Sequence, residues 1–155
     1  MIITIDGPAG SGKSTAAREL ARALGIAHLD TGATYRAATL LAMRRGIDLA
    51  DEAALAELVR GLDIRLEYDG DELRVLLNGE DVSRQIRSAE VSDHSHYIAR
   101  APAVREVLVS LQRRVGRALA ASAGGVVAEG RDQGSVVFPD ADVKFWLDDM
   151  AIANE

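Results

Sequence analysis

The chain has 155 residues, of which 48% are hydrophobic and 27% are charged, and its formal net charge at pH 7 is −6. This length fits one domain with a sizeable core, and the composition is that of a globular protein. The acidic balance argues against nucleic acid as the main partner, because a nucleic-acid surface needs a basic stripe.

The cysteine content and the N-terminal sequence indicate in which cellular compartment the protein is expected. The chain contains no cysteine, which excludes a disulfide framework and thiolate chemistry. No stretch approaches the length of a membrane span. The first residues, MIITIDG, lack the basic region of a signal peptide and lead directly into a glycine-rich loop. We therefore expect a cytoplasmic protein that has no membrane partner.

The first 25 residues predict a strand, a loop and a helix in succession. Residues 2–5 are apolar and rich in β-branched side chains, which favours a buried strand. Residues 12–24 keep apolar side chains at helical spacing, and Gly25 supplies the helix stop. Between them, GPAGSGKST (residues 7–15) fits the phosphate-loop pattern G-x-x-x-x-G-K-[ST]. The strand before the loop and the helix after it make the pattern specific.

This loop has the chemistry needed to bind a nucleoside triphosphate. Its glycines let successive N–H groups point inward and form an anion nest at a helix N-terminus. We expect Lys13 to reach the β- and γ-phosphates and the Ser14 hydroxyl to ligate Mg²⁺, with ATP or GTP as the ligand. The predicted triphosphate-binding residues are Gly7, Pro8, Ala9, Gly10, Ser11, Gly12, Lys13, Ser14 and Thr15.

Two further helices are predicted before the pattern changes. Residues 34–45 keep a helical spacing that Gly46 ends, which would place Arg36 in the first helical turn, where the dipole favours an anion. Asp51 is a candidate N-cap for a third helix that ends at Gly61.

The next segment reads as a small antiparallel insert. Residues 64–68 alternate in polarity, which predicts a strand, and Asp69-Gly70 is a hairpin turn signal. Residues 73–77 predict the second strand of the hairpin. Asn78-Gly79 is another turn signal. We place the insert approximately at residues 62–100 of a single domain covering residues 1–155.

The last part of the chain returns to the first pattern. Pro102 opens a long helix that stops at Gly124-Gly125, and short apolar strands follow at residues 126–128 and 143–147. Strands that alternate with helices predict an α/β fold whose parallel sheet is flanked by helices on both faces.

Several segments together resemble the bacterial cytidylate kinases, in the family's order and roughly its spacing, over residues 1 to about 147. The resemblance implies a nucleoside monophosphate kinase fold with a five-stranded parallel sheet and an enlarged monophosphate-binding insert. The segments are DTGATYR (30–36), LNGEDVS (77–83), Ile86-Arg87 with Glu90-Val91-Ser92, Val104-Arg105, and GRDQGSVVFP (130–139).

The resemblance also implies a reaction, the Mg²⁺- and ATP-dependent phosphorylation of CMP or dCMP. Lys13, Arg36 and Arg131 would be the catalytic residues, since two arginines would grip the phosphate of CMP against the charge of ATP. Arg105 and Asp132 match the family's contacts to the cytosine ring, whose amino group and acceptors suit a carboxylate and an arginine. The predicted CMP-binding residues are Asp30, Thr31, Tyr35, Arg36, His96, Arg105, Arg131 and Asp132.

Alternatives to these assignments remain open. Asp30 or Thr31 would also serve as a cap for the second helix. His96 occupies a position where the family commonly has a serine that touches the base, so a preference for another acceptor such as UMP is an alternative. The family continues beyond the strand at residues 143–147 into an arginine-rich lid, so a truncated nucleotide-binding domain with little or no kinase activity is a further alternative. We expect a monomer.

Overall fold

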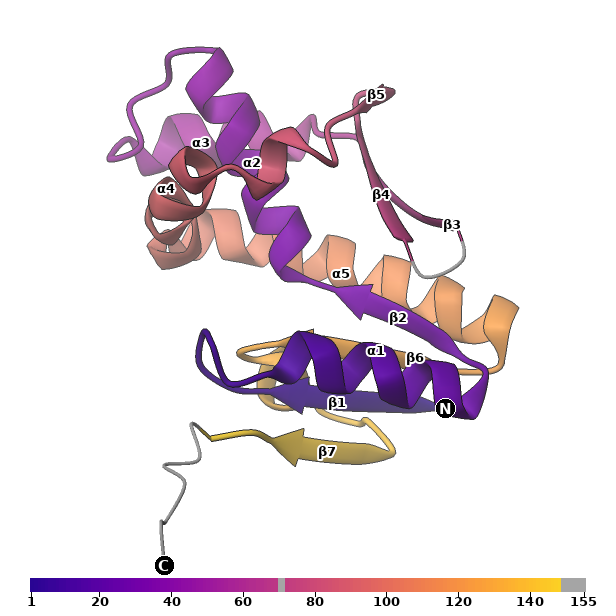
Figure 1. The fold of residues 1–155 in the computed structure, drawn as a ribbon. Helices are drawn as coiled ribbons and strands as arrows, with labels where there is room; N and C mark the ends of the chain where they lie inside the picture. Colours follow the sequence, from indigo (N-terminus) through magenta and orange to yellow (C-terminus); the bar gives the residue numbers. More distant parts are fainter. Residues whose placement is uncertain (70–71, 149–155) are drawn as a thin grey trace, which may run out of the picture. The chain divides into compact units, whose positions relative to one another are not determined.

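The computed structural model describes residues 1–69 and 72–148 and divides the chain into two compact units (Figure 1). The first, here called the sheet unit, combines Met1–Thr31 with Gln112–Glu155. The second, the middle unit, is Gly32–Leu111. In the described residues no helix has both the length and the apolar character needed to cross a membrane. The insert bounds given above, residues 62–100, stay a prediction.

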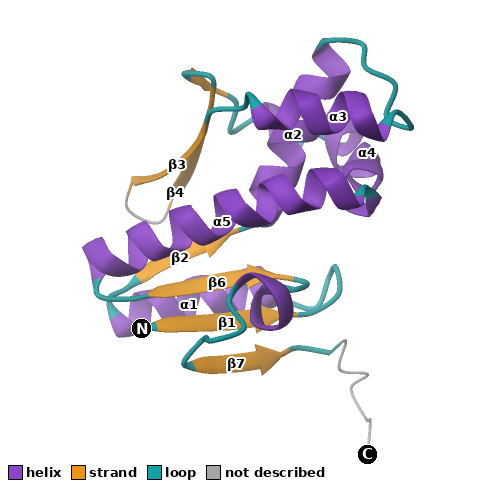
Figure 2. Ribbon diagram, turned by 180° about the vertical axis from the view of Figure 1, so that it is seen from behind, coloured by secondary structure: helices purple, strands orange, loops and turns teal. Residues whose placement is uncertain are grey.

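The sheet unit is built on four parallel strands in its described residues. They are β1 (Ile2–Asp6), β2 (Ala27–Asp30), β6 (Val126–Gly130) and β7 (Val143–Trp146), in the spatial order β2-β6-β1-β7. Figure 2 shows β1, β6 and β7 running in one direction. The predicted strands at residues 2–5, 126–128 and 143–147 are confirmed as parallel strands. β2 was not predicted from the sequence, and the five strands implied by the resemblance compare with four in residues 1–69 and 72–148.

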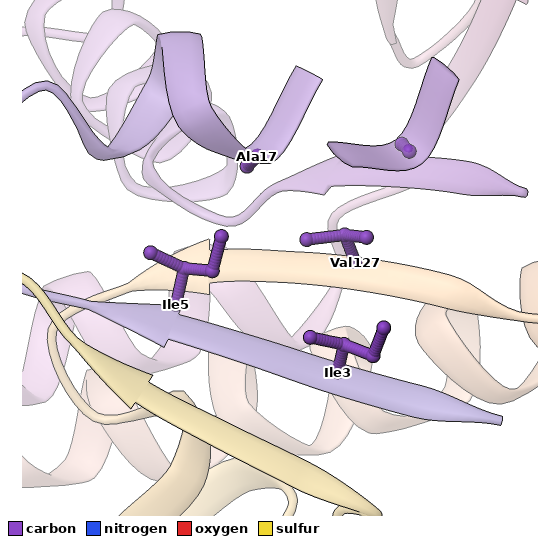
Figure 3. Packing of buried hydrophobic residues seen from close by; sticks show 5 residues of the cluster. Ile3, Ile5, Ala17 and Val127 are labelled. Carbon is purple, nitrogen blue, oxygen red and sulfur yellow. The ribbon is translucent and has the colours of Figure 1, made fainter. Parts of the chain in front are cut away.

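One face of this sheet is covered by α1 (Lys13–Leu24), the helix predicted after the loop. Ile3 and Ile5 of β1 and Val127 of β6 pack with Ala17 and Ala21 of the helix (Figure 3). The two alanines are small, so the helix backbone can approach the β-branched side chains closely. This packing fixes the helix N-terminus beside the carboxyl end of β1.

The opposite face is covered by the C-terminal part of α5 (Pro102–Ala123). Gly116 lies so close to Phe138 and Leu29 that an added Cβ would stand 2.5 Å from Phe138 Cζ and 3.3 Å from Leu29 Cδ2. Phe138 and Leu29 are fully buried. Helical cover on both faces is therefore confirmed for the centre of the sheet, whereas all four side chains of β7 are exposed.

A single π-helical turn, η2 (Gln133–Val137), follows β6 and was not predicted. Val137 N and Phe138 N donate to the carbonyls five residues earlier, over 3.1 Å and 2.6 Å. Arg113 of α5 caps the turn, since its Nε and Nη2 donate to the carbonyls of Val137 and Val136 over 2.9 Å and 2.7 Å. Such turns occur frequently at functional sites.

The middle unit is mainly helical. It contains α2 (Gly32–Arg44), α3 (Glu52–Arg60), the 3₁₀ turn η1 (Gln85–Arg87), α4 (Ala89–Arg100) and the first part of α5. The capping prediction for α3 is confirmed, because the Asp51 carboxylate accepts from Ala54 N over 3.1 Å. The start of α2 is two residues earlier than predicted. Arg36 is therefore its fifth residue and lies beyond the first turn.

The helix α4 was not predicted, because its apolar residues are sparse. Ser88 is its N-cap and accepts from Val91 N over 3.2 Å, while Val91 and Ile98 are its buried residues. Only two buried positions in a 12-residue helix leave a weak periodic signal.

The predicted hairpin is confirmed. Its strands are β3 (Ile64–Asp69) and β4 (Glu72–Leu77), which pair antiparallel, and a short β5 (Glu80–Asp81) extends the sheet. Asn78 and Gly79 have φ values of 50° and 86°, so both central residues of the predicted second turn occupy the left-handed region. The predicted Asp69-Gly70 turn lies partly outside the described residues.

Candidate active site

The loop predicted to bind phosphate connects the carboxyl end of β1 to the N-terminus of α1. Gly12 is the N-cap of α1 and has φ 84°, a conformation that residues with a Cβ rarely adopt. Gly12 has no side chain that could cap this helix end. The first N–H groups of a helix have no partner within the helix and can bind an anion, and Lys13 Nζ donates to Pro8 O of the same loop over 3.1 Å.

Close backbone contacts hold the start of the loop. Gly7 N donates to Gly130 O at the end of β6 over 3.2 Å. A Cβ added at Gly7 would lie 2.3 Å from Leu147 O and 2.9 Å from Ser11 Oγ, so only glycine fits there. The loop is thus anchored to the strands on both sides of β1.

A buried carboxylate that the sequence analysis missed contacts the loop serine. Ser14 Oγ donates to Glu129 Oε1 over 2.6 Å, and Glu129 Oε2 lies 3.0 Å from His28 Nε2. The Glu129 side chain is 3% exposed. Its signal in the sequence is a charged residue that ends an otherwise apolar strand, next to the Gly130-Arg131 pair.

A second missed carboxylate, Asp6, fixes the segment that carries two predicted site residues. Asp6 Oδ1 accepts from Gln133 N over 2.7 Å, and its Oδ2 accepts from Gly134 N over 2.8 Å. Both oxygens therefore hold the backbone directly after Arg131 and Asp132. Gln133 Nε2 also lies 3.3 Å from Asp132 Oδ1. Asp132 is half-buried and Arg131 is exposed.

Asp30, predicted to bind CMP, ends β2 beside Glu129, and Thr31, also predicted to bind CMP, follows it. Asp30 is opposite Glu129 in the parallel register. The Thr31 hydroxyl is buried and donates to Glu129 O over 2.6 Å. The structure therefore brings the loop, Asp30, Thr31, Arg131 and Asp132 to the carboxyl ends of neighbouring strands, where α/β sheets bind ligands.

The other predicted CMP-binding residues belong to the middle unit. Tyr35 and Arg36 are adjacent and half-buried on α2, and Arg105 is half-buried near the start of α5. His96 is exposed on α4, with its ring centroid 4.1 Å from that of Tyr97. The ligand-binding roles of all these residues stay predictions.

The oxygen ligands near the loop suit a magnesium ion bound together with phosphates. In the part of the chain that the structure describes, no group of three or more His, Cys, Asp or Glu side chains could hold a metal alone. Magnesium at nucleotide sites typically takes one or two protein oxygens and completes its shell with phosphates and water. The Ser14 hydroxyl, backed by the Glu129 carboxylate, fits that requirement.

A glycine loop at the end of the first parallel strand, with its lysine and serine opening the next helix, is the arrangement of the phosphate-loop nucleotide-binding fold. The family model described as "Cytidylate kinase" matches residues 3–153. The chain belongs to the cytidylate kinase family.

Individual relatives agree with this assignment. The chain is 51% identical over 147 residues to a cytidylate kinase of Geobacter sp. (strain M21), and 53% identical over 146 residues to one of Pelotomaculum thermopropionicum. These matches cover 95% and 94% of the chain and 61% and 62% of the relatives. A cytidylate kinase of Rhodococcus opacus (strain B4) is 50% identical over 154 residues, which cover 99% of the chain and 66% of the relative. The chain thus spans just under two thirds of these relatives' length.

Proposed function

We propose that this chain binds ATP with Mg²⁺ and takes part in phosphorylating CMP or dCMP, which yields ADP and CDP or dCDP. The observation that carries the proposal is the anchored phosphate loop, with Lys13 and Ser14 at the open N-terminus of α1, in a member of the cytidylate kinase family. We further propose that it acts in the cytoplasm as a monomer, and that neither nucleic acid nor membrane is a partner.

The proposed chemistry is positioning and charge stabilisation without a covalent intermediate. Lys13 would leave Pro8 O and bind the β- and γ-phosphates of ATP. Ser14 would hold the Mg²⁺, which neutralises phosphate charge when bound. The four negative charges of ATP and the two of the acceptor phosphate need further cations, and we assign this role to Arg36 and Arg131.

The proposed acceptor is a cytosine nucleotide because of Asp132 and Arg105. Cytosine presents an amino group beside ring acceptors, so a carboxylate and a guanidinium complement its edge, whereas uracil has an oxygen in place of the amino group. The hydrogen bonds of Asp6 to Gln133 N and Gly134 N support a fixed position for the backbone next to Asp132.

Two lysine variants test the triphosphate site. We expect Lys13→Ala to abolish detectable Mg·ATP binding in calorimetry, since the loop loses its only lysine. Lys144→Ala is the matched control, because Lys144 Nζ also donates to a proline carbonyl, Pro139 O over 2.6 Å, but lies outside the loop. Equal Mg·ATP affinity in the parent and Lys13→Ala would refute the assignment.

The acceptor is tested by a coupled assay of ADP release with CMP, dCMP, UMP and AMP. We expect CMP and dCMP to give the highest rates and Lys13→Ala to give none above background. A rate with UMP equal to that with CMP would remove the cytosine assignment while leaving the ATP site intact.

A further inference from the structure

Three side chains from three elements of the sheet unit form one hydrogen-bond chain. His28 on β2 contacts Glu129 on β6 through Nε2 and Oε2, at 3.0 Å. The other oxygen of the same carboxylate accepts from Ser14 Oγ, at 2.6 Å, at the start of α1. These hydrogen bonds therefore connect a residue outside the phosphate loop to the hydroxyl that we propose as the metal ligand.

The sheet register places these side chains on one face. Val127 packs against α1, and Glu129 lies two residues further along β6, so both side chains point to the face that α1 covers. His28 is directly opposite Val127 in the parallel pair, which puts its side chain on this face as well. The backbone thus fixes the contact between His28 and Glu129.

Burial makes this contact important for the carboxylate. The side chain of Glu129 is 3% exposed and that of His28 is 13% exposed. If the contact between them is removed, water therefore has little access to replace the lost hydrogen bond. We assign the donor roles to Nε2–H of His28 and to the hydroxyl of Ser14, because an ionised carboxylate only accepts hydrogen bonds. When the Ser14 hydroxyl donates a hydrogen bond to Glu129, the lone pairs of its oxygen stay available to a cation.

We propose that His28 is a positioning residue for the magnesium ion of the nucleotide site. It holds Glu129 in the orientation that accepts the Ser14 hydroxyl, and Glu129 in turn orients Ser14. Without the Nε2–H donor, the buried carboxylate would turn toward other donors and Ser14 would lose its fixed orientation. The phosphate contacts of the loop N–H groups and Lys13 would remain. The inference rests on the ATP site proposed above.

The test separates metal binding from nucleotide binding. ATP affinity is measured by calorimetry in EDTA, and again while Mg²⁺ is titrated, for the parent, His28→Leu and His28→Gln. Leucine removes the donor, whereas the glutamine amide keeps one. For His28→Leu we expect a rise of about 10–100-fold in the Mg²⁺ concentration that gives half of the full change in ATP affinity. Losing such a supporting contact usually weakens metal binding by this factor. ATP affinity in EDTA should be unchanged, and His28→Gln should stay close to the parent.

The outcomes distinguish the two proposals. Parental Mg²⁺ dependence in His28→Leu would overturn the role of His28, and so would equal losses in the leucine and glutamine variants, because the donor would then not matter. A loss of ATP affinity in EDTA would indicate general damage and would also overturn it. Absence of ATP binding in the parent would instead overturn the proposed function. If His28→Leu does not fold, His28→Met provides the same comparison.

Discussion

Asp132 and Arg36 are predicted to recognise different parts of the acceptor. Because Asp132 would accept from the amino group of cytosine, which uracil lacks, we expect Asp132→Ala to reduce the preference for CMP over UMP by about 1–3 kcal/mol. Arg36 would bind the phosphate that all acceptors share, so Arg36→Ala should weaken CMP, UMP and AMP alike. Calorimetric titration of each monophosphate measures both effects.

The two variants also serve as controls for each other. A loss that is uniform across bases in Asp132→Ala, or base-dependent in Arg36→Ala, would contradict the assigned roles. If UMP bound the parent as tightly as CMP, His96 would be the first residue to examine, since it stands where the family commonly has a serine.

The site carboxylates show what residue-level reading of the sequence can and cannot find. The loop residues could be predicted because their order along the chain is itself the signal. Glu129 and Asp6 could not, because their roles depend on partners 115 and 127 residues away, Ser14 and Gln133. Only the register of the parallel strands brings such pairs together, and a single sequence does not encode that register in any local pattern.

At the scale of elements, the segment LNGEDVS has a clear structural role. Asp81 Oδ1 accepts from both the backbone N and the hydroxyl of Ser83, over 3.0 Å and 2.5 Å. Ser83 Oγ in turn accepts from Val75 N of β4 over 2.9 Å. Asn78 Oδ1 accepts from Asp63 N over 3.1 Å, just before β3. The segment therefore joins the end of the hairpin back to its own strands.

This network predicts a pH dependence. The Ser83 hydroxyl and N–H, with a smaller contribution from Arg74, lower the pKa of Asp81 below its ordinary value of 3.8. A carboxyl with a lowered pKa in the folded state stabilises that state above its ordinary pKa, and the contribution is lost as the pH falls through the folded-state pKa. The parent should therefore exceed Asp81→Asn in free energy of unfolding near neutral pH.

Urea denaturation at several pH values measures this difference, which should shrink as the pH is lowered below 3.8. Asp140→Asn removes an exposed carboxyl in the turn before β7 and is the control for the loss of one negative charge. A constant difference between the parent and Asp81→Asn across the range would show that the charge of Asp81 does not contribute.

The packing of α5 on the sheet gives a second element-level prediction. In Gly116→Ala, the new methyl group meets Phe138 Cζ at 2.5 Å and Leu29 Cδ2 at 3.3 Å, and both of these side chains are fully buried. Overpacking typically costs about 1–3 kcal/mol, more than the gain of up to about 1 kcal/mol in helix propensity. We therefore expect Gly116→Ala to lower the free energy of unfolding in urea denaturation.

The double variant Gly116→Ala/Phe138→Leu identifies the cause. Phe138→Leu alone should be destabilising because it leaves a cavity, but the new methyl group would fill part of that space. The double variant should accordingly be more stable than the sum of the two losses predicts, with a coupling of about 0.5–3 kcal/mol. Strict additivity would mean that the methyl group is accommodated elsewhere.

At the scale of the whole molecule, segments with a regular spacing of apolar residues were predicted correctly, whereas segments without such a spacing were missed. The phosphate-loop helix, the hairpin and the long α5 have strong periodicity and clear stops. The short β2 has only Leu29 fully buried, and α4 has two buried residues, so neither produces a period that exceeds chance. The π-helical turn η2 depends on the Arg113 cap and on Asp6, which are distant in sequence.

The division into units was also invisible in the sequence. The sheet unit joins residues 1–31 to residues 112–148 through parallel pairing of β6 with both β1 and β2. A parallel strand pair needs a crossover connection, and here the crossover between β2 and β6 contains the whole middle unit. Length and composition do not show which segments pair, and the single domain expected over residues 1–155 stays a prediction.

The chain carries a natural optical reporter beside its phosphate loop. Trp146 is the only tryptophan, its side chain is 61% exposed, and its indole N–H donates to Asp148 Oδ1 over 2.9 Å. The next residue, Leu147, donates its N–H to Asp6 O over 2.8 Å, and its carbonyl lies against Gly7. Rearrangement of the loop around phosphates should therefore change the surroundings of the indole.

We expect intrinsic fluorescence excited at the indole to change in intensity when Mg·ATP is added to the parent, and to saturate with the affinity that calorimetry gives. Lys13→Ala should show no such change, whereas Lys144→Ala should retain it. A saturable signal of equal size in Lys13→Ala would mean that the indole senses something other than the loop. With this signal, rapid mixing can time the loading of the site without any attached dye.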